Sequence, residues 1–456
     1  MRPRRFLLSS PSLPFLPRAC FTLSAAAFLC GGAQAQNLVT LHQAASSYDS
    51  AYQSARFQRD AAISRSDQAR AGLLPSAGLS GQAGYAQTRI NATGAPPADR
   101  NGASQSLGIN ASQPLYRPAN SISFEQSKRA IDIAQLQLDA ASQELLVRVS
   151  QAYFDVLAGQ DTLAFVRAQK TAVVEQLAFA KRNFEVGTST ITDTREAQAR
   201  YDLVVAQEIA ADNDLRVKRL ALDQLVGKDN VEPRPLALPV QLPPVQPDTV
   251  ARWVQTSEDN QPAVRQALVA LRVARLETDK AKTGHLPTVD LTAGYNIARN
   301  PIGAAVPAGV SYRTNSTSVG VTLNLPLFAG FAVQNRVRET LMLEQKAEAD
   351  LETARRTVAQ ATRTAFFGVI SGQGQVAALE AAEASSQSAL DANKLGYQVG
   401  VRINIDVLNA QSQLYQTKRD LAQARYNVLL GQLKLRQAVG ILTADDLQPV
   451  NALLAP

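Results

Sequence analysis

Residues 119–186 read ANSISFEQSKRAIDIAQLQLDAASQELLVRVSQAYFDVLAGQDTLAFVRAQKTAVVEQLAFAKRNFEV, a stretch of 68 residues with no proline and one glycine, Gly159. Apolar and small side chains recur along it at steps of three and four, which is typical of a coiled-coil helix. At about 1.5 Å per residue such a helix is roughly 100 Å long. A helix of this length must lie along other helices, so we expect an elongated, mainly α-helical protein.

The first 35 residues have the composition of a secretory signal peptide. Four arginines precede the apolar run of residues 19–29, and this run leads to the small-x-small cleavage signal AQA at residues 33–35. The alternative is a lipoprotein with Cys30 as the lipidated residue, but Phe28 and Leu29 occupy positions where that processing requires small side chains. We therefore expect residues 1–35 to be removed.

Removal of this leader would change both the thiol content and the charge of the chain. Cys20 and Cys30 are the two cysteines of the sequence, so the mature chain of 421 residues would carry no disulfide and no thiolate metal site. The formal net charge would fall from +7 to +3, because the leader holds four of the 46 basic residues and none of the 39 acidic ones. A charge of +3 gives no support for a nucleic-acid partner.

An internal duplication organises the mature chain. LLPSAGL at residues 73–79 recurs as HLPTVDL at 285–291, and FEVGTSTITD at 184–193 recurs as YQVGVRINID at 397–406. The offset is 212 or 213 residues for each pair. The sequence therefore predicts one structural unit present twice, at 36–227 and 249–440. A proline-rich extended connector at 228–248 joins the two units, and a tail of the same character follows at 441–456.

Each unit is predicted to run helix, strand, strand, long helix, helix. Helical periodicity covers Leu41–Gly72 without a break, and the long helices are expected at about 119–186 and 330–399. The pair Gly372 and Gly374 aligns near Gly159, so both long helices are expected to loosen at a similar height, and this marks a candidate bend in each. A second helix is expected from about Ile191 to Val226.

The period of the apolar residues changes to two between the helices of each unit. We expect strands at about 75–91, 103–117, 286–299 and 313–327. In the third strand apolar residues alternate with polar or small ones, namely Val289, Leu291, Ala293, Tyr295 and Ile297. Strands with one apolar and one polar face suit a membrane β-barrel. The alternative is a hairpin on a soluble core, but the chain has no further β-pattern from which to build a sandwich.

The number of strands indicates how many copies associate. Four strands cannot close a barrel, and an open edge cannot face lipid because its unpaired N–H and C=O groups cost several kcal/mol each. Two copies would give an eight-stranded barrel filled by side chains, whereas three would give twelve strands around a lumen. Small polar residues such as Ser76, Ser80 and Thr292 suit a water-filled lumen, so we expect a homotrimer.

The duplicated plan, the proline-flanked hairpins and the paired turns FEVGTSTITD and YQVGVRINIDVLNAQ make the sequence similar to the TolC family of outer-membrane channel proteins. This resemblance covers nearly the whole mature chain. It implies a homotrimer with a twelve-stranded β-barrel in the outer membrane of a Gram-negative bacterium, in contact with outer-membrane lipid, and a periplasmic coiled-coil α-helical barrel. It also implies the exit duct of an efflux or type I secretion system, joined through a periplasmic adaptor to an inner-membrane ABC or proton-driven transporter.

The resemblance also assigns roles at the helix-to-helix turns, which form the periplasmic tip of such channels. Tyr397 and Arg402 correspond to the aromatic and basic partners of a latch that holds the tip closed. Thr192 and Asp193 correspond to the acceptors of that latch. An exposed contact between arginine and a carboxylate stabilises by about 0.2–1 kcal/mol, so three copies could hold a closed state that a docking partner displaces.

Further residues of the tip are assigned to the aperture and to docking. Asp406 corresponds to the first of two aspartate rings that line the aperture, and Asn409 stands where the second would fall, a departure that bears on cation selectivity. The turns themselves are expected to dock the adaptor, through Val186, Gly187, Val399 and Gly400. Simpler roles remain open, because an aspartate such as Asp193 or Asp406 commonly caps a helix and Arg402 could be a solvated loop charge.

Other functions fit the sequence less well. A periplasmic coiled-coil adaptor would carry one helical hairpin inserted into β-rich domains, and a diffusion porin would have more strands and few helices. The two histidines, His42 and His285, have no partner at metal-ligand or catalytic spacing, and no phosphate-binding glycine loop is present. We therefore expect no enzyme activity, no cofactor and no metal site.

Overall fold

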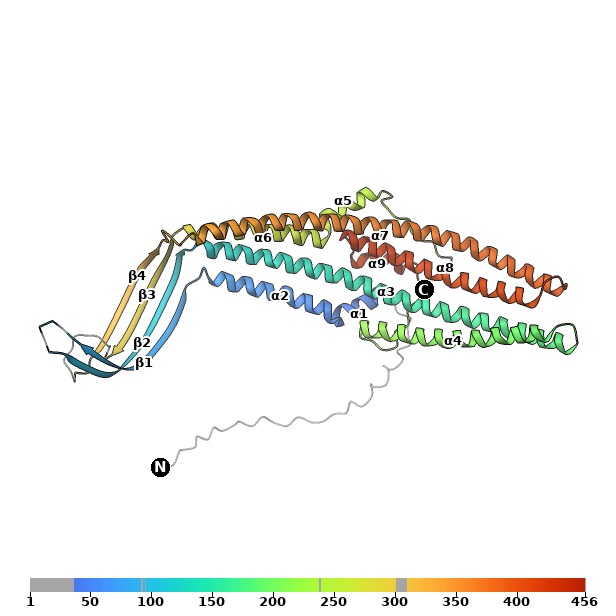
Figure 1. The fold of residues 1–456 in the computed structure, drawn as a ribbon, viewed down its shortest axis with the longest axis horizontal. Helices are drawn as coiled ribbons and strands as arrows, with labels where there is room; N and C mark the ends of the chain where they lie inside the picture. The colour runs from blue at the N-terminus through green and yellow to red at the C-terminus, as the bar shows by residue number, and fades with distance from the viewer. Residues whose placement is uncertain (1–36, 92, 95, 238, 301–309, 456) are drawn as a thin grey trace, which may run out of the picture.

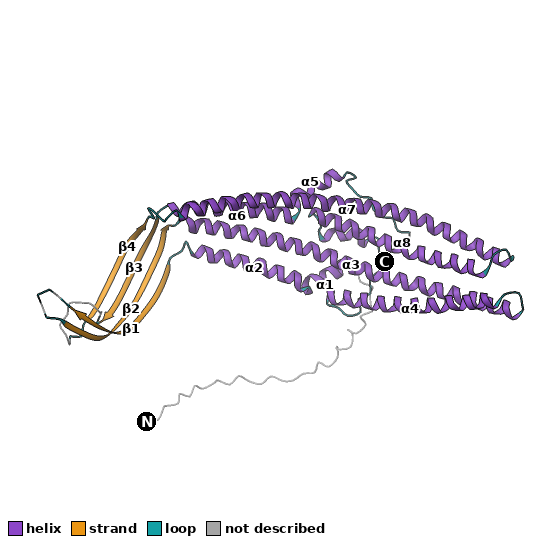
Figure 2. Ribbon diagram, in the orientation of Figure 1, coloured by secondary structure: helices purple, strands orange, loops and turns teal. Residues whose placement is uncertain are grey.

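The computed structural model describes residues 37–91, 93–94, 96–237, 239–300 and 310–455, so the predicted leader with Cys20 and Cys30 lies outside the described residues. The described chain is elongated, with long helices running side by side and an antiparallel sheet continuing from one of their ends (Figure 1). Helix is the dominant structure, and the named strands all lie at that end (Figure 2). The expectation of an elongated, mainly helical protein is confirmed.

The elements repeat in the predicted order. The first repeat consists of α1 (Leu38–Tyr48), α2 (Ser50–Ala71), β1 (Ser76–Ile90), β2 (Ala98–Tyr116), α3 (Pro118–Glu185) and α4 (Ile191–Val226). The second consists of α5 (Val250–Asn260), α6 (Pro262–Lys282), the short 3₁₀ helix η1 (Thr283–His285), β3 (Thr288–Arg299), β4 (Arg313–Asn324), α7 (Ala332–Gln398) and α8 (Asn404–Val439). The tail holds η2 (Ala444–Asp446) and α9 (Leu447–Asn451).

The first helix of each repeat is broken, and the prediction of an unbroken helix over Leu41–Gly72 is wrong. Asp49 has an extended backbone with ψ of 118°, and its side chain accepts a hydrogen bond from Tyr52 N at 2.7 Å, so it caps α2. Arg148 of α3 donates to the same carboxylate at 3.0 Å. Gln261, 212 residues further on, breaks α5 from α6 in the same way. No proline or glycine precedes Asp49 to signal the break.

The sheet has the order β1-β2-β3-β4, and the β2–β3 pair joins the two repeats. The β1–β2 ladder continues to Ile90 opposite Ala98, whereas β3 pairs with β2 only as far as Arg299 opposite Gln105. The first hairpin is therefore the longer, and β2 begins before the predicted residue 103. Strand β4 ends at Asn324 instead of 327, since Pro326 has no N–H to donate.

The long helices pack as two hairpins, α3 with α4 and α7 with α8, and α3 and α8 bring the hairpins together. Gly159 and Gly372 lie in uninterrupted helix. A Cβ at Gly159 would lie 3.3 Å from Leu215 Cδ1, and one at Gly372 would lie 2.9 Å from Val428 Cγ2. Gly159 therefore lets α4 approach α3 closely, and Gly372 lets α8 approach α7 closely. This close packing explains both glycines without a bend in either long helix.

The largest apolar core lies in the middle of the rod, where α1, α3, α4, α8 and α9 meet the connector. Tyr153 is fully buried there, and its hydroxyl donates to Arg234 O at 2.9 Å and accepts from Arg234 N at 2.8 Å. Leu236 of the connector forms a β-bridge with Leu454 of the tail. The prediction of an extended tail is wrong in part, because a capping box between Thr443 and Asp446 starts a helical segment.

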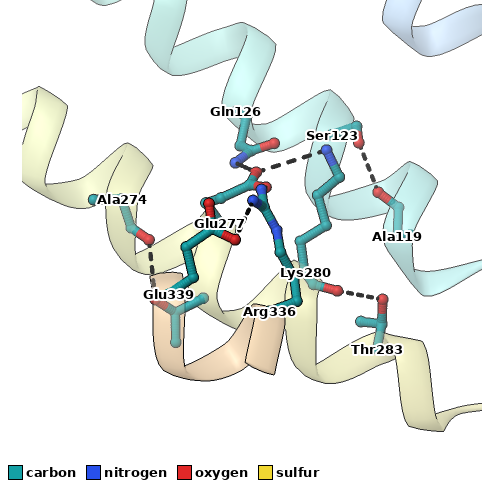
Figure 3. Close-up of polar contacts among 10 residues, drawn as sticks. Ala119, Ser123, Gln126, Ala274, Glu277, Lys280, Thr283, Arg336 and Glu339 are labelled. Atoms are coloured by element: carbon teal, nitrogen blue, oxygen red, sulfur yellow. Dashed lines mark hydrogen bonds and ion pairs between the residues drawn. The ribbon is translucent and has the colours of Figure 1, made fainter. Parts of the chain in front are cut away.

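A polar cluster joins α3 of the first repeat to α6 and α7 of the second (Figure 3), at the end of the rod that meets the sheet (Figure 1). Glu277 of α6 accepts a hydrogen bond from Gln126 of α3 at 2.9 Å and one from Arg336 of α7 at 2.7 Å. The hydrogen bond from Gln126 and the contact with Arg336 lower the pKa of Glu277, against the opposite effect of its partial burial. Among the described residues, no helix has the length and hydropathy to cross a bilayer.

Candidate channel tip and channel wall

The two helix-to-helix turns lie at the end of the rod opposite the sheet (Figure 1). Gly187 and Gly400 have φ of 77° and 78°, in the left-handed region that glycine adopts without steric cost. A Cβ at either position would meet nothing within 4 Å, so these glycines serve the chain reversal and not close packing. Their neighbours Val186 and Val399 are 73% and 65% exposed, and the predicted docking turns are therefore open to solvent in one chain.

Hydrogen bonds close the first turn on itself. Thr190 is the N-cap of α4: its hydroxyl accepts from Asp193 N at 3.2 Å, and the Asp193 carboxylate accepts from Thr190 N at 3.0 Å. Ser189 Oγ donates to the same carboxylate at 2.7 Å. Partial burial would raise the pKa of Asp193, but the bonds from Ser189 and Thr190 outweigh it and lower the pKa. Asp193 thus acts as a helix cap.

The second turn lacks this capping box. Ile403 occupies the N-cap position of α8 and has no side-chain acceptor. Asp406 is the repeat equivalent of Asp193, and its carboxylate lies 3.7 Å from Arg402 Nη1. The stem of Arg402 packs on Gly396, where a Cβ would lie 2.7 Å from Arg402 Cγ. In place of a capping box, the second turn therefore has one long and solvent-accessible ion pair. Such a pair stabilises the folded state by at most about 1 kcal/mol.

Tyr397 lies near the end of α7, between the two hairpins. Its ring packs edge-on against Phe179 of α3, with a centroid distance of 5.7 Å. Its hydroxyl is buried and has no hydrogen-bond partner among the described residues. An unsatisfied buried hydroxyl costs about 1–3 kcal/mol, so this group destabilises the tip of the isolated chain.

Polar and apolar contacts join the two hairpins near the tip. Asn404 donates to Asp193 O at 3.5 Å and accepts a hydrogen bond from Gln176. Arg200 Nη2 of α4 donates to Asn409 Oδ1 of α8 at 2.8 Å, so the predicted aperture residue Asn409 is paired. An apolar cluster lies behind these contacts and consists of Val166, Val173, Leu177, Ala180, Ala197, Val204 and Leu408.

The four predicted latch residues are not joined within one chain. Thr192 is exposed, and Asp193 is occupied by its own turn. Tyr397 has no acceptor, and Arg402 faces Asp406. A latch among these residues therefore requires contacts between neighbouring copies, and it stays a prediction.

Sequence reasoning missed the contacts that Arg200, Gln176 and Phe179 make across the hairpins. Arg200 could have been found, because it follows Asp193 by seven residues on α4 and so lies on the same helix face. Gln176 and Phe179 carry no such signal, since their partners are more than two hundred residues away in the chain.

The sheet presents two chemically different faces. Cross-strand register places Leu79, Ile109 and Tyr295 in one row, and Ser80, Gly108 and Asn296 in the next row on the opposite face. The apolar face also carries Leu107, Leu291, Ile297, Val319, Val321 and Leu323. Its large side chains are mostly exposed, with Leu79 at 71% and Val319 at 74%. In the described chain β1 and β4 each have one unpaired edge. An apolar face of this extent marks an interaction surface.

Comparison with known proteins agrees with this architecture. The profile of the outer membrane efflux protein family matches residues 40–228 and 253–441, once per repeat. The chain therefore belongs to the outer membrane efflux protein family.

Individual relatives extend the likeness to nearly the whole chain. The chain is 35% identical to the outer membrane protein TolC of Vibrio cholerae, over 96% of this chain and 97% of that protein. It is 29% identical to the protease secretion protein PrtF of Dickeya chrysanthemi, over 92% of each. The crystal structure of the Campylobacter jejuni outer membrane channel CmeC superposes with a TM-score of 0.77 at 17% identity, covering 89% of this chain and 86% of that one.

Proposed function

We propose that three copies of the mature chain form an exit duct in the outer membrane, through which an inner-membrane transporter expels its cargo. The observation that carries this proposal is the sheet: one exposed apolar face, one polar face and two unpaired edges in each chain. Edge strand β4 of one copy pairs with β1 of the next, so that twelve strands close around a polar lumen. The apolar faces then contact outer-membrane lipid.

The helices extend this lumen into the periplasm. The hairpins of three copies line up as a coiled-coil barrel whose wall is wettable on both faces, since charged and amide side chains cover the helix surfaces outside the seams. The polar cluster around Glu277 holds α3, α6 and α7 together where the rod meets the sheet, and so keeps the helical lumen in register with the barrel.

The tip is the gate of the duct. In the closed state Tyr397 and Arg402 of one copy bind Thr192 and Asp193 of its neighbour, and Asp406 and Asn409 line the aperture. The 3.7 Å separation of Arg402 from Asp406 supports this proposal, because the exposed side chain of Arg402 is available to a second copy. The hydroxyl of Tyr397 has no partner among the described residues, and a small shift of its buried ring would have to expose it to a neighbour. The Arg200–Asn409 bond reduces the anionic character of the aperture, which favours weak cation selectivity.

Docking partners act on the same end. A periplasmic adaptor binds the exposed turns at Val186, Gly187, Val399 and Gly400 and links the duct to an ABC or proton-driven transporter. The similarity to both TolC and PrtF, whose name refers to protease secretion, supports a role in efflux or type I secretion. The duct itself is not an enzyme. The family match and the duplicated plan favour this function over a periplasmic adaptor.

The test is the mass and the activity of the mature protein purified from outer membranes. Light scattering in detergent should give three polypeptides per particle, and the particle should conduct ions in a planar bilayer. A monomer that is stable in water without detergent would contradict the proposal.

A further inference from the structure

Two arginines lie side by side on the apolar face of the sheet, at the end away from the helices. Arg299 closes β3, Arg313 opens β4, and the two are directly opposite each other in the register. Both are exposed and share the face of Leu107 and Ile297. Like charges directly opposite on neighbouring strands repel, so this pair needs a counter-charge to be favourable.

The described chain supplies no carboxylate to this pair. Within residues 76–116 and 288–324, the acidic residues are Asp99 and Asp290. Asp99 binds Arg89 with two hydrogen bonds of 2.6 and 2.8 Å in the longer hairpin, and Asp290 binds Arg117 at the helix end of the sheet. Among the described residues, Arg313 donates to the neutral Asn315, at 3.2 Å.

Neighbouring segments cannot supply the counter-charge either. The sequence between the two arginines, residues 300–312, contains no aspartate or glutamate. A second copy pairing its β1 with this β4 would bring residues 76–90, which also contain none. Neither the loop nor the β1 strand of a second copy therefore places a carboxylate beside the two arginines, and an anion from outside the protein would supply the counter-charge.

The surface next to the arginines is amphipathic. A hollow of about 590 Å³ is lined by Arg299 and Arg313 together with Gln105, Leu107, Ile297 and Ala83. Register places Leu107 and Ile297 opposite each other, one step nearer the helices than the arginines. A ligand that fits has an anionic head at the arginines and a hydrocarbon chain along Leu107 and Ile297.

The depth of the pair matches a membrane boundary. From Val289 to Arg299 strand β3 rises about 34 Å at about 3.4 Å per residue, which is about 25 Å along the membrane normal for a strand tilted by about 40°. This equals the height of the apolar band of an outer-membrane barrel. With Val289 at the periplasmic boundary, Arg299 and Arg313 reach the headgroups of the outer leaflet, where an arginine on the lipid face costs little.

We infer that Arg299, Arg313 and the apolar surface of Leu107 and Ile297 form a binding site for a phosphorylated lipid of the outer leaflet, one per subunit. Arginine side chains bind phosphate oxygens in bidentate fashion, and two of them balance one doubly charged phosphomonoester. The inference rests on the proposed barrel, since the site needs a membrane against the apolar face. The bound lipid then anchors each subunit in the outer leaflet, and its phosphate offsets the repulsion between the two arginines.

Native mass spectrometry of the delipidated trimer in detergent tests the inference. The probes are diphosphorylated hexa-acyl lipid A, the same lipid with both phosphates removed, and inorganic phosphate alone. The wild-type trimer should bind up to three diphosphorylated lipids. R299Q and R313Q should each weaken this binding about tenfold, and the double variant further, because each removes charge-assisted hydrogen bonds. R299K/R313K should bind with intermediate affinity, since lysine keeps the charge but not the bidentate geometry.

R117Q is the matched control, because it removes one positive charge from the helix end of the same sheet, outside the hollow. It should leave lipid binding unchanged. The inference is overturned if the double variant binds the diphosphorylated lipid as tightly as wild type, if the dephosphorylated lipid binds equally well, or if millimolar inorganic phosphate displaces the lipid. A particle that is not a trimer in wild type and control alike would instead refute the proposed duct, and the lipid site with it.

Discussion

The middle of the rod and its tip both end helices at glycines with positive φ, but the surroundings of these glycines differ. Gly227 and Gly440 end α4 and α8 in the middle, Gly187 and Gly400 form the turns at the tip, and all four have positive φ. A Cβ at Gly440 would lie 2.5 Å from Gln261 Cα, whereas one at Gly400 would meet nothing within 4 Å. The helix ends in the middle are therefore fixed by close packing, and the turns at the tip are held mainly by local hydrogen bonds and ion pairs that cost little to exchange.

The two turns of the tip differ in how tightly their equivalent aspartates are held. The first turn holds Asp193 in a capping box, and the second leaves Asp406 in a long contact with Arg402. Duplication gave both turns the same glycine and the same aspartate, but only the first has a threonine at the N-cap. The second turn is thus the part of the tip that can change partners.

The largest expected effect is the difference in stability between substitutions of a packed glycine, Gly440, and of an open one, Gly400. An L-residue in the left-handed region costs about 1–2 kcal/mol, so G400A should destabilise by about that much. G440A adds a backbone clash and should lose more than about 3 kcal/mol, or fail to assemble. Thermal unfolding of the detergent-solubilised protein, followed by circular dichroism at the helix band, measures both. Equal losses would show that the middle is no more tightly packed than the tip.

An exchange of caps tests the difference between the two turns. T190A should loosen the start of α4 by about 1 kcal/mol, because the capping box is lost. I403T should have the opposite effect on α8, since it places a threonine three residues before Asp406. Hydrogen–deuterium exchange of peptides that cover the two turns reports each change. If exchange at the second turn is unaffected by I403T, the missing cap does not explain its looser structure.

The smallest effect concerns a partly buried hydrogen bond in the middle of the rod. Asp161 of α3 accepts a hydrogen bond from Tyr426 Oη of α8 at 2.6 Å. Burial raises the pKa of Asp161, and this outweighs the bond from Tyr426 and the charge of Arg425, which lower it. The contribution of Asp161 to the free energy of unfolding is therefore greatest below the pKa of an unfolded aspartate, about 3.9. This contribution is lost as the pH rises through the higher pKa of the folded state.

D161N should consequently be more stable than wild type at pH 7, by up to about 1 kcal/mol, because an amide accepts the same bond without a partly buried charge. The advantage should shrink as the pH is lowered toward 4. Thermal unfolding midpoints of both proteins across that pH range give the comparison, and D155N, which alters a carboxylate on the same helix, is the control. A constant difference at every pH would mean that Asp161 does not titrate as described.

The sequence was sufficient where a backbone signal was local. Gly187 and Gly400 at the tip and Pro118 at the start of α3 place the ends of the long helices within one or two residues. The sequence was insufficient where strand pairing or side-chain contacts, and not local composition, determined the bounds of an element. Residues 98–102 extend β2 despite a turn-like composition, because backbone pairing with residues 86–90 satisfies them whatever their side chains are. The ion pair of Asp49 with Arg148 and the hydrogen bond of Gln176 with Asn404 join segments far apart in the chain, and no local signal announces them.

Single-channel conductance in planar bilayers tests most directly whether three copies form a duct that is closed at the tip. The wild-type protein should conduct weakly, and R402S and Y397F should each conduct severalfold more, because each would remove a proposed contact between neighbouring copies. R89Q at the opposite end should conduct like wild type. Absence of any conductance from the pure trimer would contradict the duct, and equal conductance of wild type, R402S and Y397F would contradict the gate.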